Sequence, residues 1–547
     1  MFQHCGLSFD KDLGVYVGKN HGVNSFTYAD GSETYLLSVL DKVQDKSSLS
    51  RELQQHVRDW ASLYHLSLER ANLLRCFEFY GGGKASVLEL GAGCGAITRY
   101  LGEQFGLVWA VEGSLARCKC IRKRCVDLDN VRVICGNFFD IPWENIEEKF
   151  DLVTLIGVLE YGSLYFSPPS DAASSTLRLA HEVLKENGLL IIAIENKFGV
   201  KYWSGCHEDH TGIVFESLQG YPSRKGPTTY GRQELEDLLR RSGFGWVDWY
   251  LPFPDYKLPD VIINAQIPEL GNRYFVYNWI ETPFQDRGFT KRLLLFNESL
   301  VVRELSRNNL LPELANSFLV LAYKGNPKEV SKFLGLSGSW VAKKYTLRRA
   351  PCFRKCTMLV PGDPPKIIHQ RIGEQFPRVC RYKSVVQKIG EEEFVPGDLA
   401  LFSIFESIVR GDFERELLQT LRAVKDFILN NFSTGLEEEG YPLVSDQAFD
   451  VILSNVVKDV KSQELHFIDR EWELAEPLPI DYILFRNLLH MYYRFASYLP
   501  IKGKPMEQWI IENIQQIFPQ YDYRRLVHNM EREKHIATLV ASADTEG

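Results

Sequence analysis

A glycine-rich turn follows a short apolar segment close to residue 90. Residues 87–95 read Val-Leu-Glu-Leu-Gly-Ala-Gly-Cys-Gly, which places Gly91, Gly93 and Gly95 at alternate positions and Glu89 two places before the first glycine. Glycine allows left-handed backbone and a close approach to a ligand, and such turns at strand ends hold nucleotides in open α/β sheets. The turn therefore predicts a parallel sheet with a nucleoside cofactor, although plain packing turns use the same residues.

Three further apolar segments end in residues that suit a nucleoside. They are Glu112 after 107–111, Asn137 and Phe138 after 131–135, and Gly157 after 150–155. An acid at the end of the second strand can accept both hydroxyls of a ribose. An amide and an aromatic face at the end of the third strand suit an adenine ring. Four hits in the expected order favour a cofactor site over a structural turn.

The identity of the cofactor depends on Glu89. Gly91, Gly93 and Ala96 also fit the dinucleotide fingerprint G-x-G-x-x-A, so NAD-dependent sugar chemistry is an alternative. A pyrophosphate at a helix N-terminus favours neutral or positive surroundings, whereas a carboxylate before the turn suits a ligand with an ammonium and a sulfonium. S-adenosylmethionine (SAM) is such a ligand.

The order of these strands and acids, from Glu89 to Glu160, resembles motifs I to IV of the class I SAM-dependent methyltransferases. The resemblance implies a seven-stranded Rossmann-like sheet. It also implies a cofactor site formed by Glu89, Gly91, Gly93, Gly95, Glu112, Asn137, Phe138 and Gly157.

Short segments outside these motifs narrow the resemblance. Residues 64–67, 70–75, 95–103, 193–197, 208–210 and 252–259 together look like a bacterial family of methyltransferases that act on cell-surface polysaccharides. Members are often fused to glycosyltransferases or to kinase-like domains. The similarity covers roughly residues 25–325 and implies a saccharide or lipid-linked glycan acceptor, with glycosyltransferases of the same pathway as partners.

Composition predicts a soluble chain of at least two domains. The 547 residues exceed what one hydrophobic core usually supports. The net charge of −8 gives no overall attraction to nucleic acid or to an anionic membrane. No apolar run approaches the ~20 residues of a membrane span, and the N-terminus lacks a secretory signal. We expect a cytoplasmic protein, with peripheral association at the inner face of the membrane left open.

Alternating strands and helices between residues 87 and 196 predict a doubly wound parallel sheet. Apolar spacing of three and four in residues 33–79 predicts a helical cap packed on that sheet. The apolar runs 246–251 and 318–322 predict an antiparallel hairpin at its edge.

The segment after the fifth strand carries the candidate catalytic residues. Methyl transfer to a hydroxyl needs a base, and ligands bind at this end of an open sheet. We predict His210 as the base, oriented by Asp209 or Glu208, and His65 as the second candidate. Tyr202 and Trp203 are predicted stacking faces for a sugar. A histidine in a loop is also a common surface residue, and a phosphate acceptor would need no base.

The C-terminal part contains a second group of candidate residues. Asp450 and Asn455 have the D-x-x-x-x-N spacing of a kinase catalytic loop, and Asp469 ends a later short strand. In such a loop the first acid takes the substrate proton, while the amide and the later acid hold Mg²⁺ against ATP. The pattern looks like the small-molecule kinase fold of bifunctional methyltransferase-kinases that terminate O-antigen chains.

This pattern departs from the kinase signature in several places. Ala448 stands where the loop histidine is expected, residues 470–472 replace Phe-Gly, and the strand lysine is either Lys343 or replaced by Arg371. An active phosphotransferase and a degenerate scaffold or glycan-binding domain both remain open. Residues 343–383 hold eleven Lys or Arg and two acids, which fits a phosphate cradle or a solvated face.

These observations predict two domains with different functions. The ranges are 1–83 for the lead-in and helical cap, 84–325 for the methyltransferase domain, 326–339 for a linker, and 340–547 for an α+β kinase-like domain. We predict a methyltransferase that acts on a saccharide hydroxyl or sugar phosphate in surface-glycan synthesis. The alternative is a non-catalytic assembly factor that retains the cofactor fold.

Overall fold

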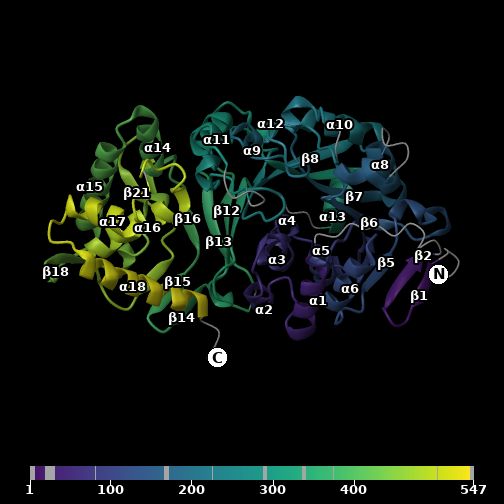
Figure 1. Cartoon of the computed structure of the whole chain (residues 1–547), viewed down its shortest axis with the longest axis horizontal. Coiled ribbons are helices and arrows are strands. Elements are labelled where there is room, and N and C mark those ends of the chain that lie inside the picture. Colours follow the sequence, from purple (N-terminus) through teal and green to yellow (C-terminus); the bar gives the residue numbers. More distant parts are fainter. Residues whose placement is uncertain are drawn as a thin grey trace. The chain divides into compact units, whose positions relative to one another are not determined.

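The computed structural model describes residues 7–18, 31–79, 82–165, 172–223, 226–286, 292–334, 340–373, 375–501 and 503–542. The chain forms two compact units (Figure 1). The first unit contains Met1–Gln266, Asp286–Leu293 and Leu311–Ser339, and the second contains Ile267–Gln285, Leu294–Leu310 and Trp340–Gly547. Two segments of the predicted range 84–325 thus group with the second unit.

The first unit is built on one large sheet. Its strands, in spatial order, are β1 (Leu7–Asp10), β2 (Val15–Gly18), β5 (Val131–Cys135), β4 (Leu107–Glu112), β3 (Ser86–Leu90), β6 (Phe150–Ile156), β7 (Leu184–Glu195), β10 (Ser317–Tyr323), β8 (Trp246–Phe253) and β9 (Val261–Asn264). Strands β2 to β7 pair in parallel. Every residue of β3 and β6 is buried, as expected for strands covered on both faces. The predicted α/β sheet with parallel strands is confirmed.

The edges of this sheet differ from the prediction. The run 318–322 does pair antiparallel with 246–251, as β10 with β8. This pair is not the edge, because β10 also pairs with β7 and β9 continues the sheet beyond β8. At the other side, part of the predicted lead-in forms the β1–β2 hairpin, whose second strand runs parallel to β5.

Helices cover the sheet on both faces. The chain moves from β3 through α5 (Ala96–Gln104) to β4, and through α6 (Leu115–Arg124) to β5, in one direction across the sheet. It moves in the opposite direction from β6 through α8 (Ala172–Val183) to β7. Because parallel crossovers are right-handed, α5 and α6 lie on one face and α8 on the other, where α10 (Arg232–Arg241) packs against it (Figure 1).

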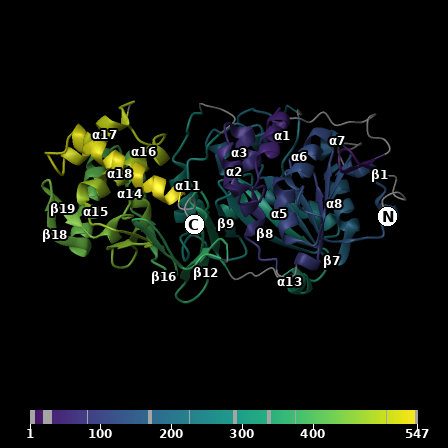
Figure 2. The same ribbon diagram turned by 90° about the horizontal axis from the view of Figure 1, so that it is seen from below.

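The predicted cap is helical and consists of α1 (Glu33–Lys42), α2 (Arg51–Gln55), α3 (Trp60–Leu66) and α4 (Asn72–Arg75). Helix α1 packs against α6 rather than directly on the sheet (Figure 2). A buried ion pair of 3.1 Å joins Glu33 to Arg117 across this contact. The remaining short helices of the unit are α7 (Gly162–Tyr165), α9 (Val200–Trp203), α12 (Leu311–Leu314) and α13 (Pro327–Leu334).

The second unit mixes small antiparallel sheets with helices. Its sheets are β11 (Ala342–Thr346), β12 (Lys355–Val360), β13 (Lys366–Arg371) and β16 (Glu391–Glu393); β14 (Val379–Tyr382), β15 (Val385–Lys388) and β22 (Trp472–Leu474); β17 (Gly397–Leu399), β20 (Val456–Asp459) and β21 (Leu465–Phe467); and β18 (Ser433–Glu438), β19 (Tyr441–Val444) and β23 (Leu478–Pro479). Its helices are α11 (Glu298–Arg307), α14 (Leu401–Arg410), α15 (Phe413–Phe432), α16 (Ile480–Phe495), α17 (Met506–Gln515) and α18 (Tyr523–Ser542).

Ion pairs explain why the segment 294–310 belongs to the second unit. Arg303 and Arg307 of α11 contact the carboxylate of Asp398 at 3.1 and 3.0 Å, and Arg303 also contacts Glu406 of α14 at 2.7 Å.

Among the helices that the structure describes, none has both the length and the apolar character needed to cross a bilayer.

Candidate active site

A cavity of about 370 Å³ lies at the carboxyl ends of the parallel strands of the first unit. Seven of the eight predicted cofactor residues line it, namely Glu89, Gly91, Gly93, Glu112, Asn137, Phe138 and Gly157. The predicted catalytic residues His65, Asp209 and His210 line the same cavity. Its volume falls in the range of small-molecule sites. The residues predicted to bind the cofactor and those predicted to act in catalysis therefore line one cavity, which has a cofactor end and an acceptor end.

The glycine turn owes its shape to left-handed backbone. Gly91, Gly93 and Gly95 have φ angles of 76°, 55° and 80°. A Cβ atom on Gly91 would lie 2.4 Å from Cγ2 of Val158, whereas one on Gly93 would meet no atom within 4 Å. Gly91 is thus needed for packing, and Gly93 leaves open space for a ligand. Gly95 does not line the cavity; a Cβ there would lie 3.0 Å from the Cα of Ile121, so its role is the contact between α5 and α6.

Two buried glutamates flank this turn. Glu112 accepts the backbone N–H of Gly93 at 2.8 Å and that of Ser114 at 2.9 Å, one on each carboxylate oxygen. A carboxylate has about four lone-pair sites, so ribose hydroxyls can still bind. Glu89 accepts the hydroxyl of Thr98 at 2.6 Å, and burial raises the pKa of Glu89 to about 8. A cation placed beside Glu89 would favour its charged form.

Aromatic rings line the end of the cavity where the sequence predicts an adenine ring to bind. The Oδ1 atom of Asn137 accepts the backbone N–H of Phe139 at 3.0 Å and caps a short turn of 138–140. The rings of Phe138 and Phe139 lie 4.6 Å apart and line the cavity. Asn137 therefore positions an aromatic face, in addition to any amide contact of its own.

Asp209 does not orient His210. Its carboxylate contacts the ammonium of Lys201 at 2.6 Å and that of Lys257 at 3.0 Å, and it accepts the hydroxyl of Tyr202. Although burial acts in the opposite direction, Lys201 and Lys257 hold the pKa of Asp209 well below its usual value. Tyr202 is fully buried, so it offers no stacking face to a sugar, whereas Trp203 is 48% exposed.

The other proposed partner, Glu208, acts on the backbone. Its carboxylate accepts the N–H groups of His210 and Thr211 at 2.9 and 2.7 Å, which fixes the loop that carries the imidazole. His65 lines the cavity from α3, and its imidazole lies beside Cys94 of the glycine turn. Of the two predicted histidines, His210 is therefore the one that lies in the same loop as Glu208 and Asp209, after β7.

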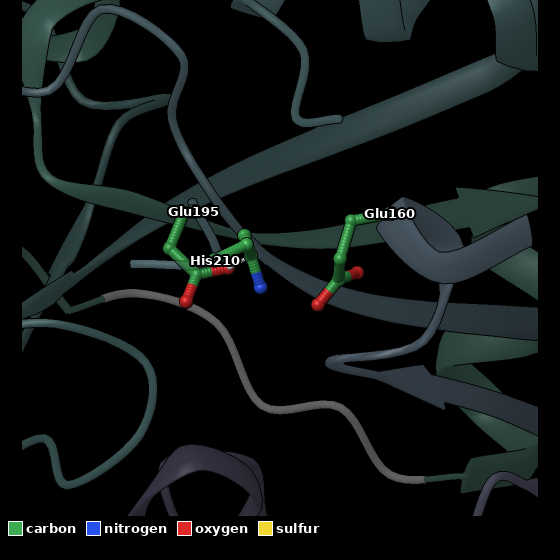
Figure 3. Close-up of side chains that lie close together, drawn as sticks. All are labelled: Glu160, Glu195 and His210. Carbon is green, nitrogen blue, oxygen red and sulfur yellow. Dashed lines mark ion pairs between the residues drawn. The ribbon is translucent and has the colours of Figure 1, made fainter. Parts of the chain in front are cut away.

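His210 lies instead against two glutamates at the ends of β6 and β7 (Figure 3). Nε2 of His210 is 3.5 Å from Oε2 of Glu195, and Nδ1 is 3.2 Å from the hydroxyl of Tyr161. Glu160 and Glu195 are 1% and 0% exposed. Burial and the charge of Glu195 raise the pKa of Glu160 to about 8, while Lys257 and His210, against burial, lower the pKa of Glu195 to about 2.

The sequence analysis used Glu160 only as the last acid of the motif order and assigned no catalytic or binding role to Glu160, Glu195 or Lys257. The available signal was position, because β6 and β7 are neighbouring parallel strands and residues after their carboxyl ends meet at one edge. The ammonium of Lys257 contacts Glu195 and also lies 3.9 Å from Asp255. No local pattern predicts that contact, because Lys257 is far from Glu195 in sequence.

In the second unit, the carboxylate of Asp450 contacts Nδ2 of Asn455 at 2.9 Å and Arg486 at 3.1 Å. The lysine that contacts Asp469 is Lys355 on β12, which also contacts Glu471 at 3.0 Å. Neither suggested residue has this place: Arg371 contacts Gln387, and Lys343 on β11 lies over the ring of Trp340.

Alanine at Gly91 and at Gly93 should have different effects. We expect Gly91→Ala to lower the melting temperature clearly, because overpacking costs ~1–3 kcal/mol and left-handed backbone a further ~1–2 kcal/mol. Gly93→Ala should lower it less but weaken SAM binding about tenfold. Gly440→Ala, at φ 80° in open space, is the matched control. Thermal melting and calorimetry with SAM would measure both; equal effects of the two substitutions would contradict this assignment.

The affinity for SAM should rise with pH because of Glu89. With a pKa of about 8, Glu89 is mostly neutral at pH 6.5 and charged at pH 9, and only the charged form attracts a cation. We expect calorimetry to show tighter binding to wild type as pH rises through 8. The change should be clearly smaller in Glu89→Gln, in which the titration of the ligand itself is the same. Parallel pH profiles would exclude Glu89 from the site.

Comparison with known proteins supports a cofactor site in the cavity of the first unit. Residues 88–192 match a family model described as a methyltransferase domain. No curated protein matches the chain. It is similar to the structures of a SAM-dependent methyltransferase from Thermotoga maritima (16% identity, 47% of this chain and 88% of that one, TM-score 0.26) and of phosphoethanolamine N-methyltransferase 2 from Haemonchus contortus with S-adenosyl-L-methionine (15%, 47% and 52%, 0.28). The family match spans the glycine turn and the strands behind the cavity, so residues 88–192 form a methyltransferase domain.

Proposed function

We propose that the first unit methylates a saccharide hydroxyl or a sugar phosphate during the synthesis of a cell-surface glycan. The main support is the single cavity, which joins the cofactor residues Glu89, Gly93 and Glu112 to the charged group around His210 and Lys257. An acceptor bound at the charged end would lie next to a methyl group held at the other end.

The lining of the cavity suits this reaction. When bound, SAM supplies an electrophilic methyl carbon, which an acceptor oxygen attacks in line as the carbon–sulfur bond breaks. The chain's residues hold the acceptor in contact range and exclude water. Flat faces come from Trp60, Tyr64 and Tyr256, and Lys257 places a cation, 15% exposed, at the acceptor end. Aromatic faces with a few polar groups are typical of such sites.

A hydroxyl acceptor must lose its proton, and a phosphate oxygen need not. His210 lines this end of the cavity with Asp209 and Lys257, and Glu160 and Glu195 lie next to its ring; of these, only His210 was predicted as a base. A lipid-linked glycan as acceptor, glycosyltransferases as partners and a cytoplasmic site, at or near the membrane, complete the proposal. The acceptor and the partners are supported by the resemblance of residues 25–325, and the cytoplasmic site by the composition of the sequence.

A comparison of surface glycans would test this function. We expect glycans from cells with the intact protein to carry methyl groups that are missing when Gly93→Asp replaces it, because the added carboxylate projects into the open cofactor space. Gly440→Asp, also at positive φ in open space, should behave as wild type. Mass spectrometry of the isolated glycans measures the difference. SAM binding without any methylated glycan would favour the assembly-factor alternative, and no SAM binding would exclude the enzyme.

We further propose phosphotransfer by the second unit, with Mg²⁺ and ATP as cofactors. The specific support is the grouping of Lys355 with Asp469 and of Asp450 with Asn455. The amide nitrogen of Asn455 donates to Asp450, which leaves the carbonyl oxygen of Asn455 to join Asp469 as a cation ligand. Mg²⁺ bound there would neutralise phosphate charge. Lys355 fits the phosphate contact that the sequence analysis sought in residues 343–383.

Turnover of ATP would decide between an active and a degenerate second unit. We expect Mg²⁺-dependent hydrolysis in wild type and at least a tenfold loss in Asp469→Ala. Glu476→Ala, which removes an exposed acid of the same unit, should retain the wild-type rate. Equal rates for wild type and Asp469→Ala would remove the kinase proposal and leave a scaffold or glycan-binding role.

A further inference from the structure

Among the described residues, four buried polar atoms without a hydrogen-bond partner converge at and beside His210, which lines the acceptor end of the cavity. They are both carboxylate oxygens of Glu160, Oε2 of Glu195 and Nε2 of His210. Each residue offers one ligand atom, and these atoms all lie within 4.8 Å of one another (Figure 3). An unpartnered buried polar group costs ~1–3 kcal/mol. Four around one point indicate a ligand that interacts with all three side chains.

The spacing of these atoms fits a metal ion. Nε2 of His210 and Oε2 of Glu195 are 3.5 Å apart, which is longer than an ordinary N–H···O hydrogen bond. Two ligands that each lie about 2.1 Å from one tetrahedral ion are about 3.4 Å apart. The observed distance is therefore that of two adjacent ligands of one tetrahedral cation.

Neighbouring residues orient the three side chains in the way that surroundings of metal sites do. Lys257 contacts Oε1 of Glu195, which leaves Oε2 directed to the common point. When Nδ1 of His210 donates to the hydroxyl of Tyr161, loss of the Nε2 proton leaves a lone pair there for an ion. Ligand histidines usually donate their other ring nitrogen to an oxygen in this manner. Lys257 also pairs with Asp209. This second carboxylate reduces the repulsion between the ammonium of Lys257 and an ion bound to Glu195.

We propose that Glu160, Glu195 and His210 bind one divalent transition-metal ion, such as Mn²⁺ or Zn²⁺. Two carboxylate oxygens suit hard ions, and the imidazole nitrogen favours a transition metal over Mg²⁺ or Ca²⁺. Three protein ligands leave coordination positions for an exogenous oxygen. The cavity supplies the access, because His210 lines it together with the cofactor turn.

This ion gives the proposed function a narrower acceptor class, and the inference rests on that function. A metal ion lowers the pKa of a hydroxyl bound to it and can hold two oxygens at once. The preferred acceptor is then a sugar with two neighbouring hydroxyls. A hydroxyl bound to this ion would lose its proton to solvent more readily, and its oxygen would then attack the methyl carbon as the carbon–sulfur bond of SAM breaks. His210 serves as a ligand in this arrangement, instead of the proton acceptor that its position in the sequence predicts.

Titration of the full chain with Mn²⁺, followed by electron paramagnetic resonance, would test the site without SAM or acceptor. We expect Glu160→Gln and His210→Ala each to bind one Mn²⁺ fewer per chain than wild type, or to bind it at least tenfold more weakly. Asp248→Asn, which changes a carboxylate on β8 bonded to Tyr323, is the matched control and should bind as wild type. Any ion held by the second unit is common to all variants and cancels in the comparison.

Calorimetry with SAM separates this inference from the proposed function. Glu160→Gln should bind SAM as wild type does, which shows that the variant is folded. Equal Mn²⁺ binding by wild type and Glu160→Gln would overturn the metal site, whether or not a chelator affects methyl transfer. Binding of an amino sugar, but no metal, would also overturn it and identify an ammonium as the ligand. A wild type that binds Mn²⁺ but not SAM would contradict the proposed function alone.

Discussion

The first unit places buried glutamates at the carboxyl ends of neighbouring parallel strands. Glu89, Glu112, Glu160 and Glu195 belong to or follow β3, β4, β6 and β7, and each is 9% exposed or less. Removing a carboxylate from water is costly unless donors or a cation replace the water. The arrangement of the site follows from how each of these charges is compensated.

Compensation is local at the cofactor end and comes from distant residues at the acceptor end. The backbone N–H groups of Gly93 and Ser114 hold Glu112, and the hydroxyl of Thr98 holds Glu89. Glu195 depends on Lys257, which arrives from the loop after β8. Within the part of the chain that the structure describes, Glu160 has no hydrogen-bond partner on either oxygen. The carboxylates at the cofactor end are therefore compensated by the chain itself, whereas the proposed ion would compensate Glu160.

This difference explains what could be predicted from the sequence. The turn and Glu112 were predictable because backbone conformation and strand order depend on short, ordered segments. The partners of Asp209 were not, because Lys257 reaches it only through the folded loop after β8. Tyr202 had the composition of a sugar platform, yet its hydroxyl pairs with Asp209 and the ring is buried. Likewise, β11, β12 and β13 all carry basic residues, and only the fold selects Lys355 as the partner of Asp469.

The same reasoning distinguishes the two units. At the acceptor end of the first unit, neither oxygen of Glu160 has a partner among the described residues, so an added cation would gain contacts to Glu160 and would replace only a proton between His210 and Glu195. In the second unit, Asp469 and Glu471 already share Lys355, and Arg349 adds a second contact to Glu471 at 2.8 Å. A metal–nucleotide complex there would have to move Lys355 from Asp469 to the phosphates. Phosphotransfer thus requires a rearrangement of existing ion pairs, whereas the first unit can take up its ligands with the side chains where they are.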